Sequence, residues 1–439
     1  GGSHHTLVIE MNTEIVVVEA PVDDARSKAV IAKIKELIPS KPIKWLINTH
    51  HHFYQTLTRA CPPALDKALF AWLVALYPVW ARMTPDYLRL AARVALAELL
   101  LSGTTTTSDH HYVFKPGLDN AIDIEIEEAR ALGMRLVATR GSMSLGEDQG
   151  GLPPRLVVQS EDVILADCER LIGRYHDPNP GAMTQVALAP CSPFSVTESL
   201  MRETGIMAAR HGVRLHTHLC ETQDEEAWCR QHFGCRPVDY LERVGWLSDR
   251  VWLAHGIWFD DGEVARLGKA KVAVSHCPTS NMILASGCCP ALKLEAAGAP
   301  VGLGVDGSAS NDSGHLLGEA RLALLLQRVA HGPVAGPAAM TAREVLEIAT
   351  LGGARVLGRD DIGALAPGMS ADLVSVRLDE IGLAGAGHDP LAALFFCHVP
   401  RVRHTVVDGR IVVRDGRLTT VDLPAHLERH NRLAAALLG

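Results

Sequence analysis

Short apolar, β-branched runs recur along the chain, and most are separated by stretches of about 20 to 60 residues with helical periodicity. Such an alternation of strand and helix signals is typical of βαβ units and a parallel sheet. Eight runs occur before the pattern changes, and eight is the number of strands that closes a barrel. They span residues 45–48, 104–108, 135–139, 185–189, 213–217, 251–254, 272–275 and 301–305. The pattern predicts an α/β fold, a distorted (β/α)8 TIM barrel.

Beyond Pro367 the helical stretches give way to short strand-like pieces at residues 371–376, 405–407 and 410–413. The Asp408-Gly409 pair between the last two pieces is a hairpin turn signal. A helix is expected near residues 425–438, so this region is predicted to be a small β-rich appendage with a closing helix. We therefore divide the chain into an atypical N-terminal segment at 1–44, a barrel at 45–366 and the appendage at 367–439.

Length and charge narrow the classes of function. A chain of 439 residues is long enough for one large domain with a smaller one. The net charge of −8 argues against a nucleic-acid binder, and no run of about 18 uncharged apolar residues predicts a membrane span. The ten cysteines are scattered without metal-site spacing, and no secretory apolar segment is visible, which favours the cytoplasm. A small-molecule substrate is the expectation.

His50 and His52 directly follow the first predicted strand, in a His-x-His pattern. Residues two apart on a strand point to the same side, so both imidazoles can reach one metal ion. Taken alone, the pair also fits a His-rich loop, although less well, because His51 stands between them.

Three further strands end in a residue of ligand type: His218 follows the fifth, His255 the sixth and Asp306 the eighth. The carboxyl ends of barrel strands open onto one face, so distant residues can converge there. Several imidazoles with a carboxylate are the ligands expected for Zn²⁺ or a similar ion that activates water. Glu221, three residues after His218, supplies a proton carrier. His216, one strand period before His218, also fits an ordinary buried histidine and receives no role.

Five motifs carry a resemblance to a known family. Four are Asn-Thr-His-His-His at 48–52, Leu-His-Thr-His-Leu-Cys-Glu at 215–221, Leu-Ala-His-Gly at 253–256 and His-Cys-Pro-Thr-Ser-Asn-Met at 276–282. The fifth, at 304–312, contains Asp306. Together they resemble the amidohydrolase superfamily, in its branch of cytosine, guanine and s-triazine deaminases. The resemblance runs from about residue 47 to the C-terminus.

The resemblance implies a metal-dependent deaminase in which ion-activated water attacks an amidine-like ring carbon and ammonia leaves. Glu221 would shuttle protons, His255 would orient the hydroxide and Asp306 would take the proton from water. No barrel-strand lysine is placed to bridge two ions, which implies one divalent ion, Zn²⁺ with Fe²⁺ as the alternative. The implied metal ligands are His50, His52, His218 and Asp306.

The resemblance also bears on the substrate. Gln55 stands where guanine deaminases of this branch present an amide to the purine, Tyr112 could stack on a ring, and Cys191 follows the fourth strand. Segments 141–143, 190–195 and 276–282 look most like the group of 8-oxoguanine deaminases and hydroxydechloroatrazine ethylaminohydrolases. This implies conversion of 8-oxoguanine to urate and ammonia, with guanine, isocytosine, cytosine and s-triazines as alternatives. The resemblance further implies a homo-oligomer.

Residues before about 45 depart from this branch. A predicted strand at 12–20, helix at 24–38 and strand at 41–48 instead resemble metallo-β-lactamase-fold hydrolases, whose His-x-His motif also follows such a strand. That fold is the runner-up, although the family needs an Asp and a His where this chain has 53–56 Phe-Tyr-Gln-Thr. We interpret the N-terminus as a chimeric join or a substituted appendage. A further alternative is a catalytically inactive barrel that binds a ligand or a partner protein. Such a barrel is expected to lack one of the metal-binding residues or Glu221, and this chain has all of them.

Overall fold

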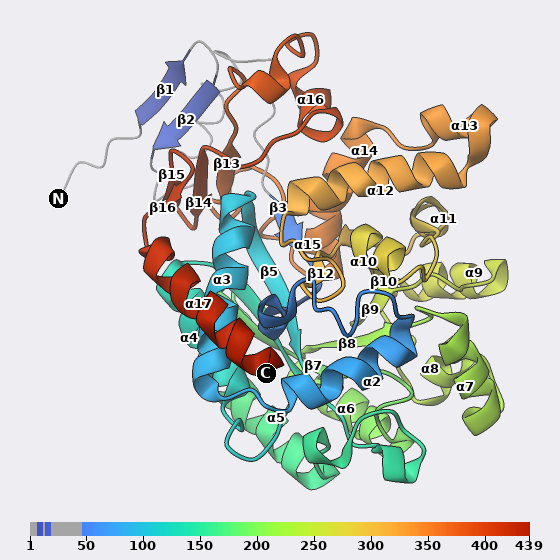
Figure 1. Cartoon of the computed structure of the whole chain (residues 1–439). Helices are drawn as coiled ribbons and strands as arrows, with labels where there is room; N and C mark the ends of the chain where they lie inside the picture. The colour runs from blue at the N-terminus through green and yellow to red at the C-terminus, as the bar shows by residue number, and fades with distance from the viewer. Residues whose placement is uncertain (1–6, 12–13, 19–45) are drawn as a thin grey trace.

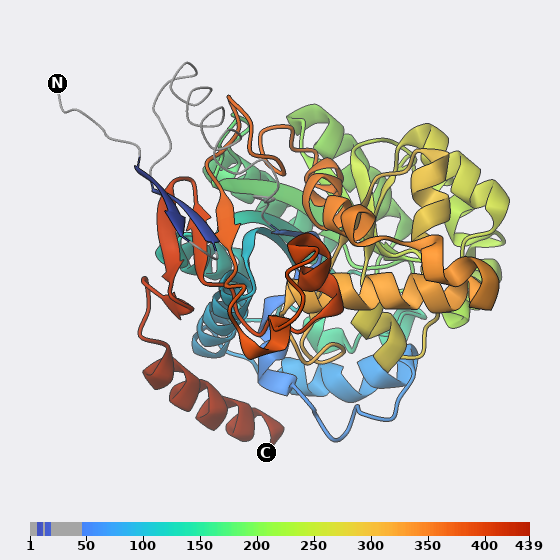
Figure 2. The same ribbon diagram turned by 90° about the horizontal axis from the view of Figure 1, so that it is seen from above.

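Eight parallel strands form a closed barrel in the order β10-β11-β3-β5-β6-β7-β8-β9. The structure is a computed structural model that describes residues 7–11, 14–18 and 46–439. The barrel strands lie at the centre of the molecule, with helices around them (Figures 1 and 2). They are β3 (Leu46–Asn48), β5 (Thr104–His111), β6 (Arg135–Ser142), β7 (Thr184–Pro190), β8 (Arg214–Leu219), β9 (Val251–His255), β10 (Ala273–His276) and β11 (Val301–Leu303). The predicted fold class is confirmed, and for this region the metallo-β-lactamase alternative is wrong.

The eighth strand is shorter than predicted, since it ends at Leu303 and does not continue to residue 305. Beyond it the chain forms β12 (Asp306–Gly307), which pairs in parallel with β4 (His51–His52) in a separate two-stranded sheet. In this register Asp306 faces His51. The pairing places the end of the eighth strand beside the end of the first.

Helices form the outer layer. Two of them, α4 (Ala121–Leu132) and α6 (Glu198–His211), are capped by Gly133 and Gly212, whose φ angles of 77° and 70° lie in the left-handed region that glycine adopts without strain. From α3 onward, each barrel strand is followed by one or more helices, as the predicted alternation requires. They are α3 (Pro85–Leu101), α4 (Ala121–Leu132), α5 (Glu161–Tyr175), α6 (Glu198–His211), α7 (Gln223–Phe233), α8 (Pro237–Arg243), α9 (Asp261–Ala270), α10 (Pro278–Ile283), α11 (Ala291–Ala297), α12 (Leu316–Ala330), α13 (Gly332–Ala339), α14 (Ala342–Glu347) and α15 (Gly353–Val356).

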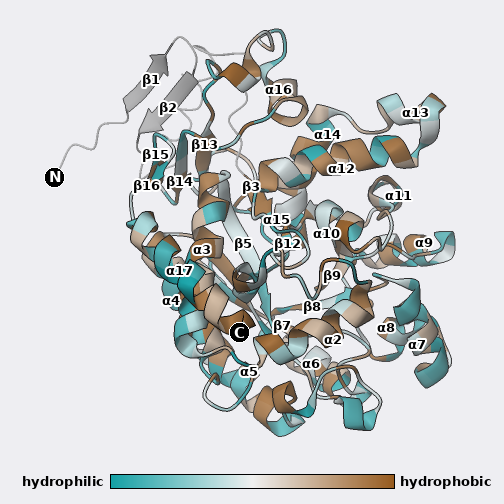
Figure 3. Cartoon of the chain, in the orientation of Figure 1, coloured by the Kyte–Doolittle hydropathy of each residue, from teal (hydrophilic) through white to brown (hydrophobic). Residues whose placement is uncertain are grey.

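Two elements between the first and second barrel strands lie at the barrel mouth. The short helix η1 (Phe53–Thr58) follows β4 directly, and α2 (Leu69–Trp80) comes after a partly exposed loop. α2 contains no charged residue, and Figure 3 shows it white to brown, unlike the largely hydrophilic α7. Such a helix is stabilised by burying apolar surface, which α2 does against the barrel.

The C-terminal region contains a four-stranded antiparallel sheet of β13 (Leu373–Ser375), β14 (His404–Val407), β15 (Arg410–Arg414) and β16 (Arg417–Leu418). It also holds α16 (Pro390–Phe396) and α17 (Leu423–Leu438), and α17 packs against α3 and η1. The buried His430 of α17 forms a 3.1 Å hydrogen bond between its Nε2 and the Thr56 hydroxyl of η1. The predicted appendage and closing helix are present, while the domain boundaries stay predictions.

At the N-terminus, β1 (Leu7–Met11) and β2 (Glu14–Val18) form an antiparallel hairpin beside the C-terminal sheet (Figures 1 and 2). β2 falls within the strand predicted at 12–20. The helix predicted at 24–38, on which much of the metallo-β-lactamase resemblance rests, lies outside the described residues. Among the helices that the structure describes, none combines the length and apolar character needed to cross a bilayer.

Candidate active site

The five strand-end residues predicted from the sequence meet at the mouth of the barrel. The β8 and β9 strands pair with Leu219 opposite His255, and β4 pairs with β12, so the histidines and Asp306 are brought to one face. His255 and Asp306 have φ angles of 70° and 61°, which non-glycine residues seldom adopt. Left-handed backbone at such positions costs of order 1 kcal/mol and is common at functional sites. Here it turns each side chain into the site.

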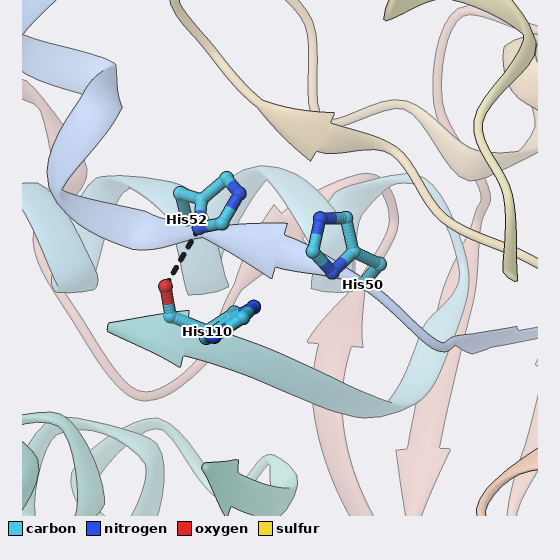
Figure 4. Close-up of side chains that lie close together, drawn as sticks. All are labelled: His50, His52 and His110. Atoms are coloured by element: carbon cyan, nitrogen blue, oxygen red, sulfur yellow. Dashed lines mark hydrogen bonds between the residues drawn. The ribbon is translucent and has the colours of Figure 1, made fainter. Parts of the chain in front are cut away.

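His52 and His218 are both held by backbone carbonyl groups. The Nδ1 of His52 donates to the carbonyl oxygen of His110 at 2.6 Å, the contact drawn in Figure 4. The Nδ1 of His218 donates to the carbonyl oxygen of Cys191 at 2.7 Å. Because a carbonyl can only accept, the hydrogen sits on Nδ1, and each Nε2 of a neutral ring carries a lone pair. Burial lowers the pKa of both rings, that of His218 to about 3, which keeps them neutral.

His50 is oriented by a second histidine. Its Nδ1 lies 2.8 Å from Nε2 of His216, whose Nδ1 in turn donates to the Trp252 carbonyl at 2.8 Å. Since that carbonyl fixes the hydrogen of His216 on Nδ1, its Nε2 accepts from His50. The Nε2 of His50 is buried and forms no hydrogen bond with any described residue. All three predicted metal-binding histidines therefore point an unprotonated Nε2 into the site.

The converging atoms are spaced as ligands of one divalent ion. Oδ1 of Asp306 lies 3.4 Å from Nε2 of His50 and 3.3 Å from Nε2 of His52. The Nε2 atoms of His218 and His52 are 3.3 Å apart, too close for two lone pairs that share no proton. Ligands at about 2.0–2.1 Å from a tetrahedral Zn²⁺ stand roughly 3.3 Å from one another. A bound cation would remove this repulsion, so the donor set fits a divalent metal site.

Neighbouring histidines enlarge this group. The described histidines include two overlapping triads with ring nitrogens within 4.8 Å of one another, His50 with His52 and His110, and His50 with His218 and His255. His110 donates its Nε2 hydrogen to the Ala189 carbonyl at 2.9 Å, and its Nδ1 has no hydrogen-bond partner among the described residues. Its ring stacks on His218 at 4.8 Å, beside the Nε2 atoms that face Asp306. Both triads therefore describe the same centre.

His255 differs from the other three rings, because it faces two carboxylates. Its Nε2 lies 3.5 Å from Glu221 and 3.8 Å from Asp306, and its Nδ1 donates to Oδ1 of Asn281 at 3.0 Å. Burial lowers its pKa, but the two carboxylates outweigh burial and raise it. The pKa of Asp306 shifts in the opposite direction. Burial disfavours its carboxylate form, but His50, His255 and His52 outweigh burial and hold the pKa of Asp306 well below its usual range. His255 is thus suited to hold a proton near an ionised Asp306.

Glu221 is presented by a turn that a second carboxylate holds in place. Glu225 accepts hydrogen bonds from the backbone N–H groups of Cys220 and Glu221 at 3.0 and 2.9 Å. Cys220 has a φ of 55°, a further left-handed residue beside the site. Burial raises the pKa of Glu221 to about 7, while the nearby His255 opposes the shift. A carboxyl group with such a pKa can both give and take a proton near neutral pH.

The three predicted substrate-binding residues line the same pocket. Gln55, Tyr112 and Cys191 are buried and share the pocket with His52, His218, Glu221, His255 and Asp306. The Gln55 side-chain oxygen accepts from the backbone N–H of Ala309 at 3.2 Å, which orients the amide group within the pocket. The prediction that these residues gather at one site fits the geometry, and their individual roles stay predictions.

Several residues of the site were not predicted from the sequence. His216, Asn281 and the His110 carbonyl orient site residues across strands, and Leu69, Trp72, Leu73 and Tyr77 of α2 form one wall of the pocket. The first histidine of the His-x-His at 216–218 was visible as a strand-periodic partner of His218. The apolar run at 69–80 is also evident in the sequence, but nothing in its pattern indicates which part of the molecule it packs against.

A parallel barrel that gathers neutral imidazoles and a carboxylate around one point, with proton-carrying side chains beside them, defines a metal-dependent hydrolase. The sequence matches the Amidohydrolase family over residues 46–412, and the chain belongs to this family.

Similar proteins fall in the same family. The chain is 58% identical to 8-oxoguanine deaminase of Pseudomonas aeruginosa over 393 residues, 90% of this chain and 86% of that protein. It is 40% identical to hydroxydechloroatrazine ethylaminohydrolase of Pseudomonas sp. (strain ADP), over 86% of this chain and 79% of that protein. Among solved structures, atrazine chlorohydrolase TrzN from Arthrobacter aurescens TC1, in complex with zinc, superposes with a TM-score of 0.85 at 34% identity. The match covers 100% of this chain and 96% of that one.

Proposed function

We propose that this protein is a hydrolytic deaminase that converts 8-oxoguanine and water to urate and ammonia. The observation that carries the proposal is the 58% identity to 8-oxoguanine deaminase across 90% of the chain. Guanine deaminases of this branch place an arginine after the fourth strand, where this chain has Cys191, and no arginine lines the substrate pocket in the described residues. The missing arginine weakens guanine as the substrate, and the 40% identity to hydroxydechloroatrazine ethylaminohydrolase gives the s-triazine alternative less support. Isocytosine and cytosine stay as further alternatives.

The proposed cofactor is one divalent ion, Zn²⁺ with Fe²⁺ as the alternative, held by His50, His52, His218 and Asp306. Three neutral imidazoles and one carboxylate are a ligand set typical of zinc. Support comes from the convergence of their donor atoms and from the zinc in the related chlorohydrolase structure. When bound, such an ion lowers the pKa of a coordinated water and so supplies a nucleophile at neutral pH.

Each of the residues around the proposed ion has a separate part in moving protons or placing the water. Asp306 accepts a proton from the attacking water, and His255, fixed by Asn281, orients that water toward the ring carbon that bears the amino group. Glu221 donates its proton to the adjacent ring nitrogen, takes up the proton of the newly added hydroxyl group and passes it to the departing amine, so ammonia leaves and a carbonyl remains. The proton that Asp306 took from water then restores Glu221 to its acid form. The pKa of Glu221 near 7 suits both transfers.

Recognition of the purine is assigned to the pocket walls. The Gln55 amide can pair with the lactam edge of the ring through a donor and an acceptor. Tyr112 offers an aromatic face, and burial raises the pKa of Cys191 to about 12, which keeps its thiol neutral. A neutral set of polar groups suits an uncharged heterocycle, because none of its members requires a counter-ion.

The test is ammonia release by the purified, zinc-loaded protein from 8-oxoguanine, guanine, isocytosine, cytosine and hydroxylated s-triazines. We expect the highest kcat/KM for 8-oxoguanine, with urate identified by its absorbance. Faster turnover of guanine would refute the substrate assignment, and no turnover of any compound by the metal-loaded protein would favour the inactive binding barrel. The proposed homo-oligomer is tested separately by sedimentation velocity, and the cytoplasmic location stays a prediction.

A further inference from the structure

The helix α2 closes one side of the pocket with a single polar group among apolar ones. Leu69, Trp72, Leu73 and Tyr77 line the pocket that also contains Glu221. The helix is fixed there, because the Trp72 indole N–H donates to the Ala309 carbonyl at 3.2 Å and Phe70 packs on Phe194 at 4.9 Å. A wall held in this way presents its side chains at fixed positions.

Tyr77 brings a hydroxyl group into this wall that has no partner. The side chain is 1% exposed, and its hydroxyl forms no hydrogen bond with any residue that the structure describes. An unpaired buried hydroxyl is destabilising and therefore calls for an explanation. Tyr240 of α8 also has a buried hydroxyl without a partner in the described chain, but it does not line the pocket. What distinguishes Tyr77 is that it lines the same pocket as Glu221, His255 and Asp306.

The chemistry of the pocket limits what Tyr77 can meet. Burial raises the pKa of the Tyr77 hydroxyl well above its usual value, so the group is a neutral donor at physiological pH. The apolar residues that line the pocket with it, Leu73, Leu284 and Phe194, offer no acceptor, and the hydroxyl is not hydrogen-bonded to any polar residue of the described chain. A bound molecule must supply one. The side chains of Glu221 and His255 are committed to the amino-bearing carbon under the proposed mechanism, so the acceptor lies elsewhere on the ring.

We infer that the Tyr77 hydroxyl donates a hydrogen bond to the carbonyl oxygen of the five-membered ring of an 8-oxopurine and so determines specificity for it. This inference rests on the proposed function. 8-Oxoguanine carries an oxygen at a carbon where guanine carries only hydrogen, and a C–H group cannot accept a hydrogen bond. That carbon belongs to the five-membered ring, at the far end of the molecule from the reacting amino group of the six-membered ring. A site built to pair with such an oxygen discriminates against the analogue that lacks it.

The experiment compares Tyr77→Phe with Tyr240→Phe, which removes an equivalent buried, unpaired hydroxyl outside the pocket. For each zinc-loaded protein, kcat/KM is measured for 8-oxoguanine, and for guanine as substrate or, where turnover is too slow, as a competitive inhibitor. We expect Tyr77→Phe to reduce kcat/KM for 8-oxoguanine about 10-fold and to change the guanine constant less than about twofold. Tyr240→Phe should alter neither constant, and both variants should keep their zinc and melt at a temperature no lower than that of the wild type, because each loses an unpaired buried hydroxyl.

Two results would overturn the inference. Equal losses for both purines in Tyr77→Phe would mean a general effect on the pocket, and an unchanged kcat/KM for 8-oxoguanine would mean that the hydroxyl does not contact the oxygen. Both results presuppose that the wild-type protein deaminates 8-oxoguanine. Absence of that activity in the wild type would refute the proposed function itself, and the inference with it, before any variant is compared.

Discussion

His216 is expected to control metal affinity without touching the metal. Its Nε2 accepts the hydrogen of His50 Nδ1 at 2.8 Å, its Nδ1 is tied to the Trp252 carbonyl, and its ring stacks on the Trp252 indole at 4.3 Å. In His216→Phe the stacking ring is retained and the acceptor is lost. The Nδ1 hydrogen of His50 is then buried without a partner, and the ring can rotate away from the orientation that directs Nε2 toward Asp306.

The size of the effect follows from this geometry. Loss of a partner that orients a metal-ligating histidine weakens metal binding by roughly 10- to 100-fold. That range corresponds to about 1.4–2.8 kcal/mol, which agrees with the cost of about 1–3 kcal/mol for an unsatisfied buried donor. His216→Gln, which offers an amide oxygen to His50 and an amide hydrogen to the Trp252 carbonyl, should recover part of the loss.

The assay is competition for Zn²⁺ between the protein and a chromophoric chelator at fixed pH. His430→Phe serves as the control, because it also removes a buried imidazole but one that bonds Thr56 and no proposed ligand. Unchanged zinc affinity in His216→Phe would refute the reasoning. So would an equal loss in His430→Phe, since the effect would then reflect general destabilisation.

Four further predictions follow from the structure. Glu221→Gln should lower kcat by about 10²- to 10⁴-fold and leave zinc content unchanged, whereas lost zinc in this variant would make Glu221 a ligand. In Gly307→Ala the new Cβ would stand 1.9 Å from the Gln55 side-chain oxygen, so Gln55 must move and KM should rise up to about 10-fold with zinc retained; an unchanged KM would remove Gln55 from substrate binding. Burial disfavours the Asp361 carboxylate, but the ion pair with Arg359 outweighs burial and lowers the pKa of Asp361 to about 2. The ionised carboxylate therefore stabilises the fold fully above about pH 4, and this stabilisation is lost as the pH falls through 2. Asp361→Asn should therefore reduce the free energy of unfolding by about 2 kcal/mol at pH 7, with the difference shrinking below pH 4 in denaturant titrations; a pH-independent difference would contradict this. Finally, a chelator should lower the melting temperature and added Zn²⁺ restore it, because an ion at 100 times its Kd stabilises the folded state by about 2.7 kcal/mol, and a melting temperature insensitive to both would argue against a resident ion.

The sequence alone determined the barrel and the location of the centre. Strand signals separated by helical stretches fix a parallel sheet, and the carboxyl ends of parallel strands must share one face. His50, His52, His218, His255 and Asp306 could therefore be grouped although they are more than 250 positions apart in the chain. Their agreement with the family motifs made the grouping specific.

Only the tertiary structure decided how these residues are held and what surrounds them. The contact between His50 and His216 depends on the stagger of strands in the closed barrel, and the eighth strand ends early so that Asp306 can pair beside His51. The place of α2 follows from burial of an apolar surface, which is non-directional and leaves no positional signal in the sequence. Hydrophobic periodicity specifies which residues are buried, whereas strand register and packing specify which neighbours they contact. The proposed role of the Tyr77 hydroxyl depends on packing alone.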